Sequence, residues 1–394
     1  MTVDMKTKDQ CSGCSACVNI CPKHCISMLP DNEGFIYPVI DKEKCVHCGL
    51  CKKNCPFEDD NKFCTNTHKT VLGAFSKNDE EKRKSSSGGI FSLLAEVVLK
   101  QNGIVFGMSL SDDCKTAHTI SIDNNKELYK LRGSKYFQGE IDDSFINAKK
   151  YLDEGRVVLF SGTPCQIAGL YSFLGKKYDN LLTVDVVCHG VPSQLLWRKY
   201  IQNDEQNRNS IIKSVNFRSK RISWEEFGLE ETFSDNTIKF ETLSHNFYLQ
   251  LFLKNYCLRH SCYNCKTKLV ADITLGDLWG GKEIFTQIFD KKGTSLVIVN
   301  SSKGNIFFGK IKSEVKYASV NYEDVIRTNP CIISSVPKPS ERDSFYLDLQ
   351  NLPFEKFQNK YKSLYWKRKK KNNSKVLMYY IKRSLLKVKN IIKF

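Results

Sequence analysis

Two cysteine runs near the start of the chain constrain its fold more than any other feature. The first run is Cys11, Cys14, Cys17 and Cys21, the second is Cys45, Cys48, Cys51 and Cys55, and a proline follows each run. This C-x2-C-x2-C-x3-C-P spacing holds two [4Fe–4S] clusters, with the fourth cysteine of each run bound to the other cluster. The spacing therefore predicts one cluster on Cys11, Cys14, Cys17 and Cys55, and a second on Cys45, Cys48, Cys51 and Cys21.

Zinc is the alternative metal for these eight cysteines, but zinc sites seldom use four cysteines at such compact, doubled spacing. The first ten residues, MTVDMKTKDQ, lack the apolar segment of a signal peptide, and no stretch reaches the ~20 apolar residues of a membrane-spanning helix. We therefore expect a cytoplasmic protein. Its 17 cysteines then read as metal ligands or packed thiols, because that compartment keeps thiols reduced.

A second cysteine group lies far downstream. Cys257, Cys262 and Cys265 have C-x4-C-x2-C spacing, and Cys188 follows a predicted strand and could complete the set. The sequence thus predicts a third [4Fe–4S] site in the body of the protein, with a structural zinc ion on the same ligands as the alternative. Either His189 or His260 could replace a cysteine. The remaining thiols without partner spacing, expected to be packed, are Cys25, Cys64, Cys114 and Cys331.

Strands and helices alternate from residue 71 onward, which predicts an α/β layer with a largely parallel sheet. Strands are expected at 71–75, 103–110, 157–161 and 181–187, and helices at 88–100, 144–154 and 164–174. After residue 205 the pattern becomes β-rich, with short strands within 214–241 and a helix near 245–256. Further strands at 271–279 and 294–300 and a helix from 303 complete the body. We expect an α+β protein with a two-cluster ferredoxin-like domain, an α/β core with an added β-rich segment, and a basic helical tail.

The net charge of +17 is concentrated at one end of the chain. Residues 356–394 hold 14 Lys or Arg and no Asp or Glu, so the rest of the chain is nearly neutral. A near-neutral body disfavours nucleic-acid binding. In the tail, apolar residues from Leu377 to Ile392 recur on one helical face, after the basic run 367–371. This pattern predicts adsorption to an anionic membrane surface; an acidic protein partner, docking on the protein's own body and a solvated charge run are the alternatives.

Two glycine- and serine-rich turns precede predicted helices and could bind an anionic cofactor. Ser85–Gly89 precedes the helix at 90–99, and Ser161–Gln166 follows a strand at the edge where open α/β sheets bind ligands. A third loop, RGSKY, brings two cations beside an aromatic ring. From spacing alone, ordinary helix capping and a solvated turn explain these segments equally well. Asp272 and Asp277 are expected to be strand-end caps and turn anchors rather than catalytic acids.

Together the doubled cysteine motif, SSSGGIFS, RGSKY, GTPCQIAGL, VDVVCHGVPS, CLRHSCYNCK and DITLGDLWG resemble the β-subunit family of coenzyme F420 hydrogenases and dehydrogenases, from about residue 8 to about 310. The resemblance implies an iron–sulfur flavoprotein that carries FAD. It also divides the chain into expected regions: a ferredoxin-type domain (1–58), a linker (59–70), the family's N-terminal-like (71–155) and C-terminal-like (156–315) regions, and a C-terminal extension (316–394).

For the cofactor, the resemblance implies FAD contacts from Ser86, Ser87, Gly88, Gly89, Arg132, Lys135, Tyr136, Thr163 and Gln166. Cys165 is expected to be a packed thiol beside the flavin, an acid in turnover, or a substitute ligand of the third cluster. Nothing in the sequence marks an F420 pocket. Family members pass a hydride between FAD and F420, while related reductases use reduced ferredoxin, and some bacterial relatives occur beside surface-polysaccharide genes.

Two functions use the same predicted residues. In the first, the protein is a redox enzyme that takes electrons from reduced ferredoxin or another donor and reduces a small organic substrate, or exchanges electrons with coenzyme F420. In the second, it is an electron relay that serves a separate catalytic partner. A nucleic-acid protein with structural clusters is disfavoured, because doubled ferredoxin runs serve electron transfer.

Overall fold

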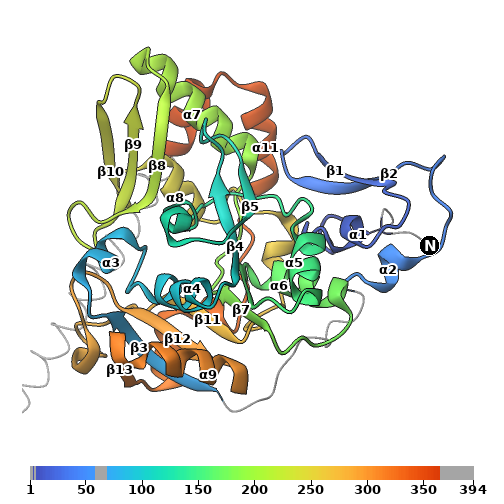
Figure 1. Cartoon of the computed structure of the whole chain (residues 1–394). Helices are drawn as coiled ribbons and strands as arrows, with labels where there is room; N and C mark the ends of the chain where they lie inside the picture. The colour runs from blue at the N-terminus through green and yellow to red at the C-terminus, as the bar shows by residue number, and fades with distance from the viewer. Residues whose placement is uncertain (1–2, 4–5, 58–68, 364–394) are drawn as a thin grey trace, which may run out of the picture. The chain divides into compact units, whose positions relative to one another are not determined.

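The computed structural model describes residue 3 and residues 6–57 and 69–363 (Figure 1). The chain forms two compact units, residues 1–342 and 343–394. In the second unit, α11 (Arg342–Asn351) and the helical residues 354–363 pack Phe345 against Phe357 and Tyr361. The basic tail from residue 364 lies outside the described residues, so its helix and its membrane contact stay predictions.

The cysteine runs build a small unit with two similar halves. The first half holds α1 (Ala16–Asn19) and the second holds α2 (Leu50–Lys53), each one turn long. Between them, β1 (Ile26–Pro30) and β2 (Ile36–Ile40) form an antiparallel hairpin in which Ile26 pairs with Ile40. The hairpin fixes the separation of the two halves, and cysteines of both runs are buried beside it.

An eight-stranded sheet forms the centre of the first unit. Its strands in spatial order are β13 (Val315–Ser319), β3 (Thr70–Ser76), β12 (Ser295–Val299), β11 (Ile273–Asp277), β7 (Leu181–Val186), β6 (Val158–Gly162), β4 (Ile104–Leu110) and β5 (Ala117–Ile122). The middle strands β11, β7, β6 and β4 are parallel, whereas β5 and the three strands beyond β11 pair antiparallel. The expected largely parallel sheet is therefore wrong at both edges, because the edge strands reach their neighbours without a helical crossover of the βαβ kind.

Helices cover both faces of this sheet. On one face lie α4 (Ile90–Lys100) and α9 (Ser302–Ile311), and on the other lie α5 (Ser144–Asp153) and α6 (Pro164–Leu174) (Figure 1). Successive strand residues point to opposite faces. Val105 packs with α4 and Phe106 with α5 and α6, so the central strands are apolar on both sides. This packing keeps the carboxyl ends of β6 and β7 at one edge, where Cys165 and Cys188 follow them.

A second, three-stranded antiparallel sheet consists of β8 (Ile212–Ser219), β9 (Gly228–Phe233) and β10 (Ile238–Thr242). It packs with α7 (Gln194–Arg208) and α8 (Phe247–Leu253) through the aromatic rings of Trp197, Phe217 and Tyr248. The expected strands of the β-rich segment and the helix after them are present. Sequence reasoning did not predict α7.

The remaining helices are α3 (Asp79–Lys84), which leads from β3 toward α4, and α10 (Tyr322–Thr328). Short 3₁₀ turns occur at Asn125–Lys130, His260–Asn264, Thr286–Ile288, Lys312–Glu314 and Pro330–Ile332. The expected α+β class is confirmed. None of the helices in the described ranges combines the length and apolar character that a membrane span requires.

Candidate metal centres and cofactor site

The first predicted group of cysteines lines one cavity. Its empty space is about 330 Å³, partly open to solvent. The sulfur-bearing residues around it are Cys11, Cys14, Cys17 and Cys55. Cys17 lies on α1 and Cys55 follows α2, so the fourth cysteine comes from the other half of the unit.

The second group lines a matching cavity of about 340 Å³. Its predicted ligands are Cys21, Cys45, Cys48 and Cys51. A further cysteine, Cys25, also lines this cavity. The two cavities reproduce the crossed grouping of the cysteines that the spacing predicts.

The backbone around both cavities follows the same conformational pattern. Gly13 and Ser15 in the first half have φ of 72° and 62°, and the equivalent His47 and Gly49 have φ of 54° and 73°. Left-handed residues between right-handed ones turn successive N–H groups inward and create anion-binding concavities of the kind found at Fe–S sites. Ser15 and His47 accept a conformation that is uncommon outside glycine, which indicates that these loops are shaped for an anionic group.

The charge and width of the cysteine groups fit an iron–sulfur cube better than a single ion. Burial raises the pKa of the Cys14 thiol, and the neighbouring Cys17, Cys55 and Cys11 raise it further. Thiolates so placed need positive charge beside them, which cluster iron supplies. Within the described ranges, no three of these sulfurs lie within 4.8 Å of one another, whereas one zinc ion with Zn–S bonds of about 2.3 Å needs sulfurs roughly 3.8 Å apart.

A third group of cysteines gathers at the carboxyl edge of the parallel strands. The Cys188 thiol interacts electrostatically with Cys262, Cys165 and Cys265, and the Cys165 thiol with Cys265. Cys165 is in the first turn of α6, Cys188 follows β7, and Cys262 is in the 3₁₀ turn His260–Asn264. Burial raises the pKa of the Cys188 thiol well above its ordinary value, and these cysteine neighbours add to the rise.

Cys257 lies among different neighbours from those the spacing suggests. Its side chain is fully buried, and its electrostatic neighbours are Arg342, Tyr248 and Tyr263. The structure thus brings Cys165 to the group with Cys188, Cys262 and Cys265, and places Cys257 outside it.

Arg259 joins the first cavity to the third group, and sequence reasoning missed it. The side chain is fully buried. Its Nε donates to the Cys11 carbonyl at 2.8 Å, and one terminal nitrogen lies 3.6 Å from Cys11 Sγ. Its positive charge also acts on the Cys165 and Cys262 thiols, where it lowers the pKa against the effect of burial. The cysteine spacing around Arg259 was a signal, but spacing does not show where an arginine points.

Helix α6 makes a second connection between the same sites. It carries Cys165 in its first turn and Gly169 one turn later. A Cβ on Gly169 would lie 3.0 Å from Cys14 Cβ and 3.1 Å from Cys14 Sγ. The absent side chain lets the loop of the first cavity approach α6 within one helical turn of Cys165.

The predicted cofactor loops meet at the start of α4. The Ser134 amide donates to Ser86 Oγ at 3.0 Å, which joins RGSKY to SSSGG. The Ser87 hydroxyl and the Gly88 amide are bound to the chain segment before β12, at Thr294 and Ser295. Side chains at Gly88 are excluded, because a Cβ would lie 2.6 Å from the Ala74 carbonyl oxygen.

The two predicted cations have different surroundings. Arg132 forms a two-pronged ion pair with Glu81, with the closer contact at 2.6 Å. Lys135 donates only to carbonyl oxygens, those of Lys130 and Arg132. Burial lowers the pKa of Lys135 to about 7. Arg132 is thus neutralised by a carboxylate, whereas Lys135 keeps its capacity to pair with an anion.

Two further cations, Arg218 and Lys220, bind the SSSGG turn, and sequence reasoning missed both. Arg218 is only 4% exposed; it donates to Asp277 at 3.0 Å and to the Ser86 carbonyl at 3.4 Å, and its buried Nε has no hydrogen-bond partner. Lys220 donates to the Ser87 carbonyl at 2.7 Å, and burial lowers its pKa to about 7. Both lie in FRSKR, which looks like a solvated strand end in the sequence.

The other predicted cofactor residues serve the local fold. Gln166 Oε1 accepts from the Thr163 amide at 2.9 Å and so caps α6. The Thr163 hydroxyl lies 3.1 Å from Cys165 Sγ. Tyr136 stacks on Phe252. These contacts account for Thr163, Gln166 and Tyr136 without a cofactor.

The two aspartates expected to be structural do hold the fold together. Asp272 accepts from the Thr183 amide at 2.9 Å. Asp277 accepts from Arg218 and from Trp224 Nε1, which lies 2.9 Å away. Among the expected packed thiols, Cys25 and Cys114 are buried and Cys331 is half-buried, whereas Cys64 lies outside the described residues.

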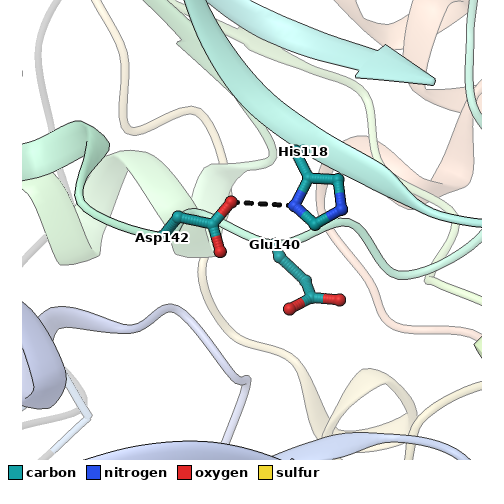
Figure 2. A group of neighbouring side chains, drawn as sticks. All are labelled: His118, Glu140 and Asp142. Carbon is teal, nitrogen blue, oxygen red and sulfur yellow. Dashed lines mark hydrogen bonds and ion pairs between the residues drawn. The ribbon is translucent and has the colours of Figure 1, made fainter. Parts of the chain in front are cut away.

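A separate surface group has side chains of metal-ligating type: His118, Glu140 and Asp142 (Figure 2). His118 Nδ1 lies 2.8 Å from an Asp142 oxygen, and Nε2 lies 3.1 Å from the Thr116 hydroxyl. Glu140 accepts from Gln194 at 3.0 Å. These contacts satisfy the imidazole on both sides, so the group is explained by pairing within the protein.

An α+β body with two crossed four-cysteine cavities defines an iron–sulfur protein of the electron-transfer class. Comparison with known families agrees with this class and identifies two regions of the chain. Residues 10–58 are a 4Fe-4S dicluster domain. Residues 155–324 belong to the family formed by the C terminus of the coenzyme F420 hydrogenase/dehydrogenase beta subunit, which confirms the resemblance found in the sequence.

Among curated proteins, the chain is similar to the coenzyme F420-dependent sulfite reductase of Methanocaldococcus jannaschii, with 21% identity over 366 residues. The match covers 90% of this chain but only 52% of the reductase, so the chain spans about half of that relative. The cysteine-rich region is also similar to an uncharacterized ferredoxin of the same organism, with 31% identity over 77 residues, 20% of this chain and 88% of the ferredoxin.

Among solved structures, the chain is similar to a chain of the F420-reducing [NiFe] hydrogenase complex from Methanosarcina barkeri. The identity is 17% and the TM-score is 0.45, over 66% of this chain and 89% of the other. The findings together make the protein an iron–sulfur protein related to F420-dependent oxidoreductases.

Proposed function

We propose that the protein is an iron–sulfur flavoprotein oxidoreductase in which three [4Fe–4S] clusters carry electrons to or from FAD. The observation that supports this best is the continuity of the sites. Arg259 contacts Cys11 at the first cavity and acts on Cys165 and Cys262 in the third group. A sequence of redox centres needs such close packing, since each electron passes between neighbouring centres.

For the third cluster we propose the ligands Cys165, Cys188, Cys262 and Cys265. The mutual electrostatic contacts of these thiols support the set. Cys165 replaces Cys257 in it, and this answers the question that the sequence left open about Cys165. The Arg259 charge beside the group would stabilise the thiolates that ligation requires.

FAD is proposed to bind where the SSSGG and RGSKY loops meet. A diphosphate needs cations without carboxylate partners and free N–H donors at a helix start. Lys135, Lys220 and the unpartnered Nε of Arg218 supply the cations, and the first turn of α4 supplies the helix start. When bound, FAD stores two electrons that single-electron carriers deliver one at a time.

The electron partners are proposed from the relatives. The related sulfite reductase is described as coenzyme F420-dependent, so coenzyme F420, or a small organic substrate together with reduced ferredoxin, is the proposed pair of reactants. A link to surface-polysaccharide synthesis rests on the resemblance alone. An electron relay for a separate catalytic partner uses the same residues and is the second candidate.

Anaerobic titration tests this proposal. The full chain, purified without oxygen and supplied with FAD, is expected to retain about one FAD per chain and to lose flavin absorbance when reduced F420 or reduced ferredoxin is added. A chain that takes up iron but no FAD would contradict the flavoprotein. A relay would be recognised if the reduced flavin reoxidised only with a protein partner and with none of the small substrates.

The affinity for FAD is expected to fall as pH rises from about 6 to about 8. Burial lowers the pKa of Lys135 and Lys220 to about 7; both are therefore charged below this pH and neutral above it, and their attraction for a diphosphate is lost. Lys220→Met is expected to raise the dissociation constant about 10–100-fold at pH 6 and to flatten the pH dependence. The matched control is Lys213→Met, at an exposed position on the same strand.

Fluorescence titration of the flavin-free protein with FAD measures both effects. A thermal melt of each variant checks that the fold is kept. Equal dissociation constants for Lys220→Met and Lys213→Met would show that the cations of FRSKR do not serve the cofactor.

A further inference from the structure

The two halves of the cysteine-rich unit differ at one position that matters for cluster binding. Cys25 lies four residues after Cys21, the last cysteine of its run. The equivalent position after Cys55 is Asp59. Only the second cavity can therefore draw on a fifth thiol supplied by the repeat.

Cys25 is placed against the second cavity rather than packed away from it. Its Sγ lies 3.4 Å from Cys21 Sγ, and its residue is 5% exposed. It lines the same cavity as Cys45, Cys48 and Cys51. A thiol that is in contact with a predicted ligand and also faces the cluster space can reach the iron that the ligand holds.

The backbone holds Cys25 in this position. The His24 amide donates to the Cys21 carbonyl at 3.2 Å, and His24 has φ of 46°, so the chain turns back after Cys21. The Cys25 carbonyl accepts from the Asp41 amide at 2.8 Å. Cys25 directly precedes β1, whose pairing with β2 fixes it from the other side. Ligation by Cys25 thus requires a side-chain rotation rather than a change in the fold.

We propose that Cys25 is a reserve ligand of the second cluster and takes the place of Cys21 when the bond between Cys21 and iron breaks. The proposal rests on the assignment of a [4Fe–4S] cluster to this cavity. One iron–sulfur bond breaks and one forms. The proton of the Cys25 thiol passes to the released Cys21 thiolate, and no electron is gained or lost. The second cluster can then survive an event that degrades the first.

The equivalence of the two halves provides the test. Cys21→Ala removes the fourth ligand of the second cluster, and Cys55→Ala removes the fourth ligand of the first. We expect Cys21→Ala to keep the full iron content of the unaltered chain, whereas Cys55→Ala loses at least one iron per chain and gains the electron paramagnetic resonance signal of a three-iron cluster. Cys21→Ala combined with Cys25→Val is expected to behave like Cys55→Ala.

Loss of iron from Cys21→Ala equal to the loss from Cys55→Ala would overturn the proposal. A second measurement applies if Cys21→Ala does not fold. The Cys25→Val variant keeps the bulk of the side chain and removes the thiol, so it should fold and bind both clusters. On exposure to air we expect its second cluster to lose iron several-fold faster than that of the unaltered chain, with the first cluster unchanged; equal rates would contradict a reserve ligand.

Discussion

Cys188→Ala is expected to lower the iron content of the anaerobic protein from about twelve to about eight atoms per chain, because it removes a ligand of the proposed third [4Fe–4S] cluster. Cys257→Ala is expected to leave the iron content unchanged, since Cys257 lies beside Tyr248 and Tyr263 rather than with the cysteine group. Both thiols are buried against neighbouring side chains, which makes Cys257→Ala a control for the general effect of losing a cysteine.

The same pair of variants separates the third cluster from the flavin. With the third cluster gone, reduction of the flavin by reduced ferredoxin should slow by at least about 100-fold, because the connection from the first cavity is interrupted. Direct chemical reduction of the flavin by dithionite should be unaffected. Iron analysis, electron paramagnetic resonance and stopped-flow absorbance measure these effects.

Cys165→Ala decides between the two ligand sets. If Cys165 is the fourth ligand, it loses the third cluster as Cys188→Ala does. If Cys257→Ala lost the cluster and Cys165→Ala kept it, the set predicted from the spacing would be right and the proposed set wrong. A content of about eight irons in the unaltered chain would exclude a third cluster with either set.

Regular local patterns made much of the structure predictable from the sequence. The crossed grouping of the eight N-terminal cysteines follows from spacing alone, because both runs repeat a motif whose geometry is set by short loops. The helix predicted at 164–174 is observed as Pro164–Leu174, where a proline begins it and Gly175 ends it in a left-handed conformation. Such signals lie within a few residues of one another in the chain.

Contacts between distant residues were beyond the reach of the sequence. Cys257 has better ligand spacing than Cys165, yet Cys165 joins Cys188 because β6 and β7 are neighbours in the sheet. Arg259 and Arg218 resemble surface cations in the sequence but are fully or nearly buried. The antiparallel edges of the large sheet likewise depend on which strands meet in space. In each case tertiary packing, rather than local propensity, determines the outcome.

The ion pair between Glu33 and Arg342 is expected to be the strongest single electrostatic contact between the β1–β2 hairpin and the core. Arg342 is fully buried and donates two hydrogen bonds to the Glu33 carboxylate, at 2.6 and 2.8 Å. Burial acts to raise the pKa of Glu33, but hydrogen bonds from His260 and Arg342 outweigh it and hold the pKa at about 2. The folded protein therefore favours the charged carboxylate.

The sign of the pH dependence follows from this lowered pKa. The stabilisation is fully present above the ordinary pKa of about 4.5 and is lost as pH falls from there toward 2. The shift corresponds to roughly 3 kcal/mol. At pH 7, Glu33→Gln leaves the Arg342 charge buried without a counter-charge, which costs about 3–5 kcal/mol.

Hydrogen exchange of the β1–β2 amides at pH 7 measures this cost while the clusters remain bound. We expect exchange in Glu33→Gln to be about 10²–10³-fold faster than in the unaltered chain, as the expected free-energy change implies. Glu43→Gln, at an exposed position of the same unit, should change exchange by less than about threefold. Replacing both partners, with Glu33→Gln and Arg342→Met, should recover part of the loss, because no buried charge then remains unpaired. Unchanged exchange in Glu33→Gln would mean that this pair does not hold the cysteine-rich unit to the core, and that Arg259 and its contacts with Cys11 and Ile36 do so instead.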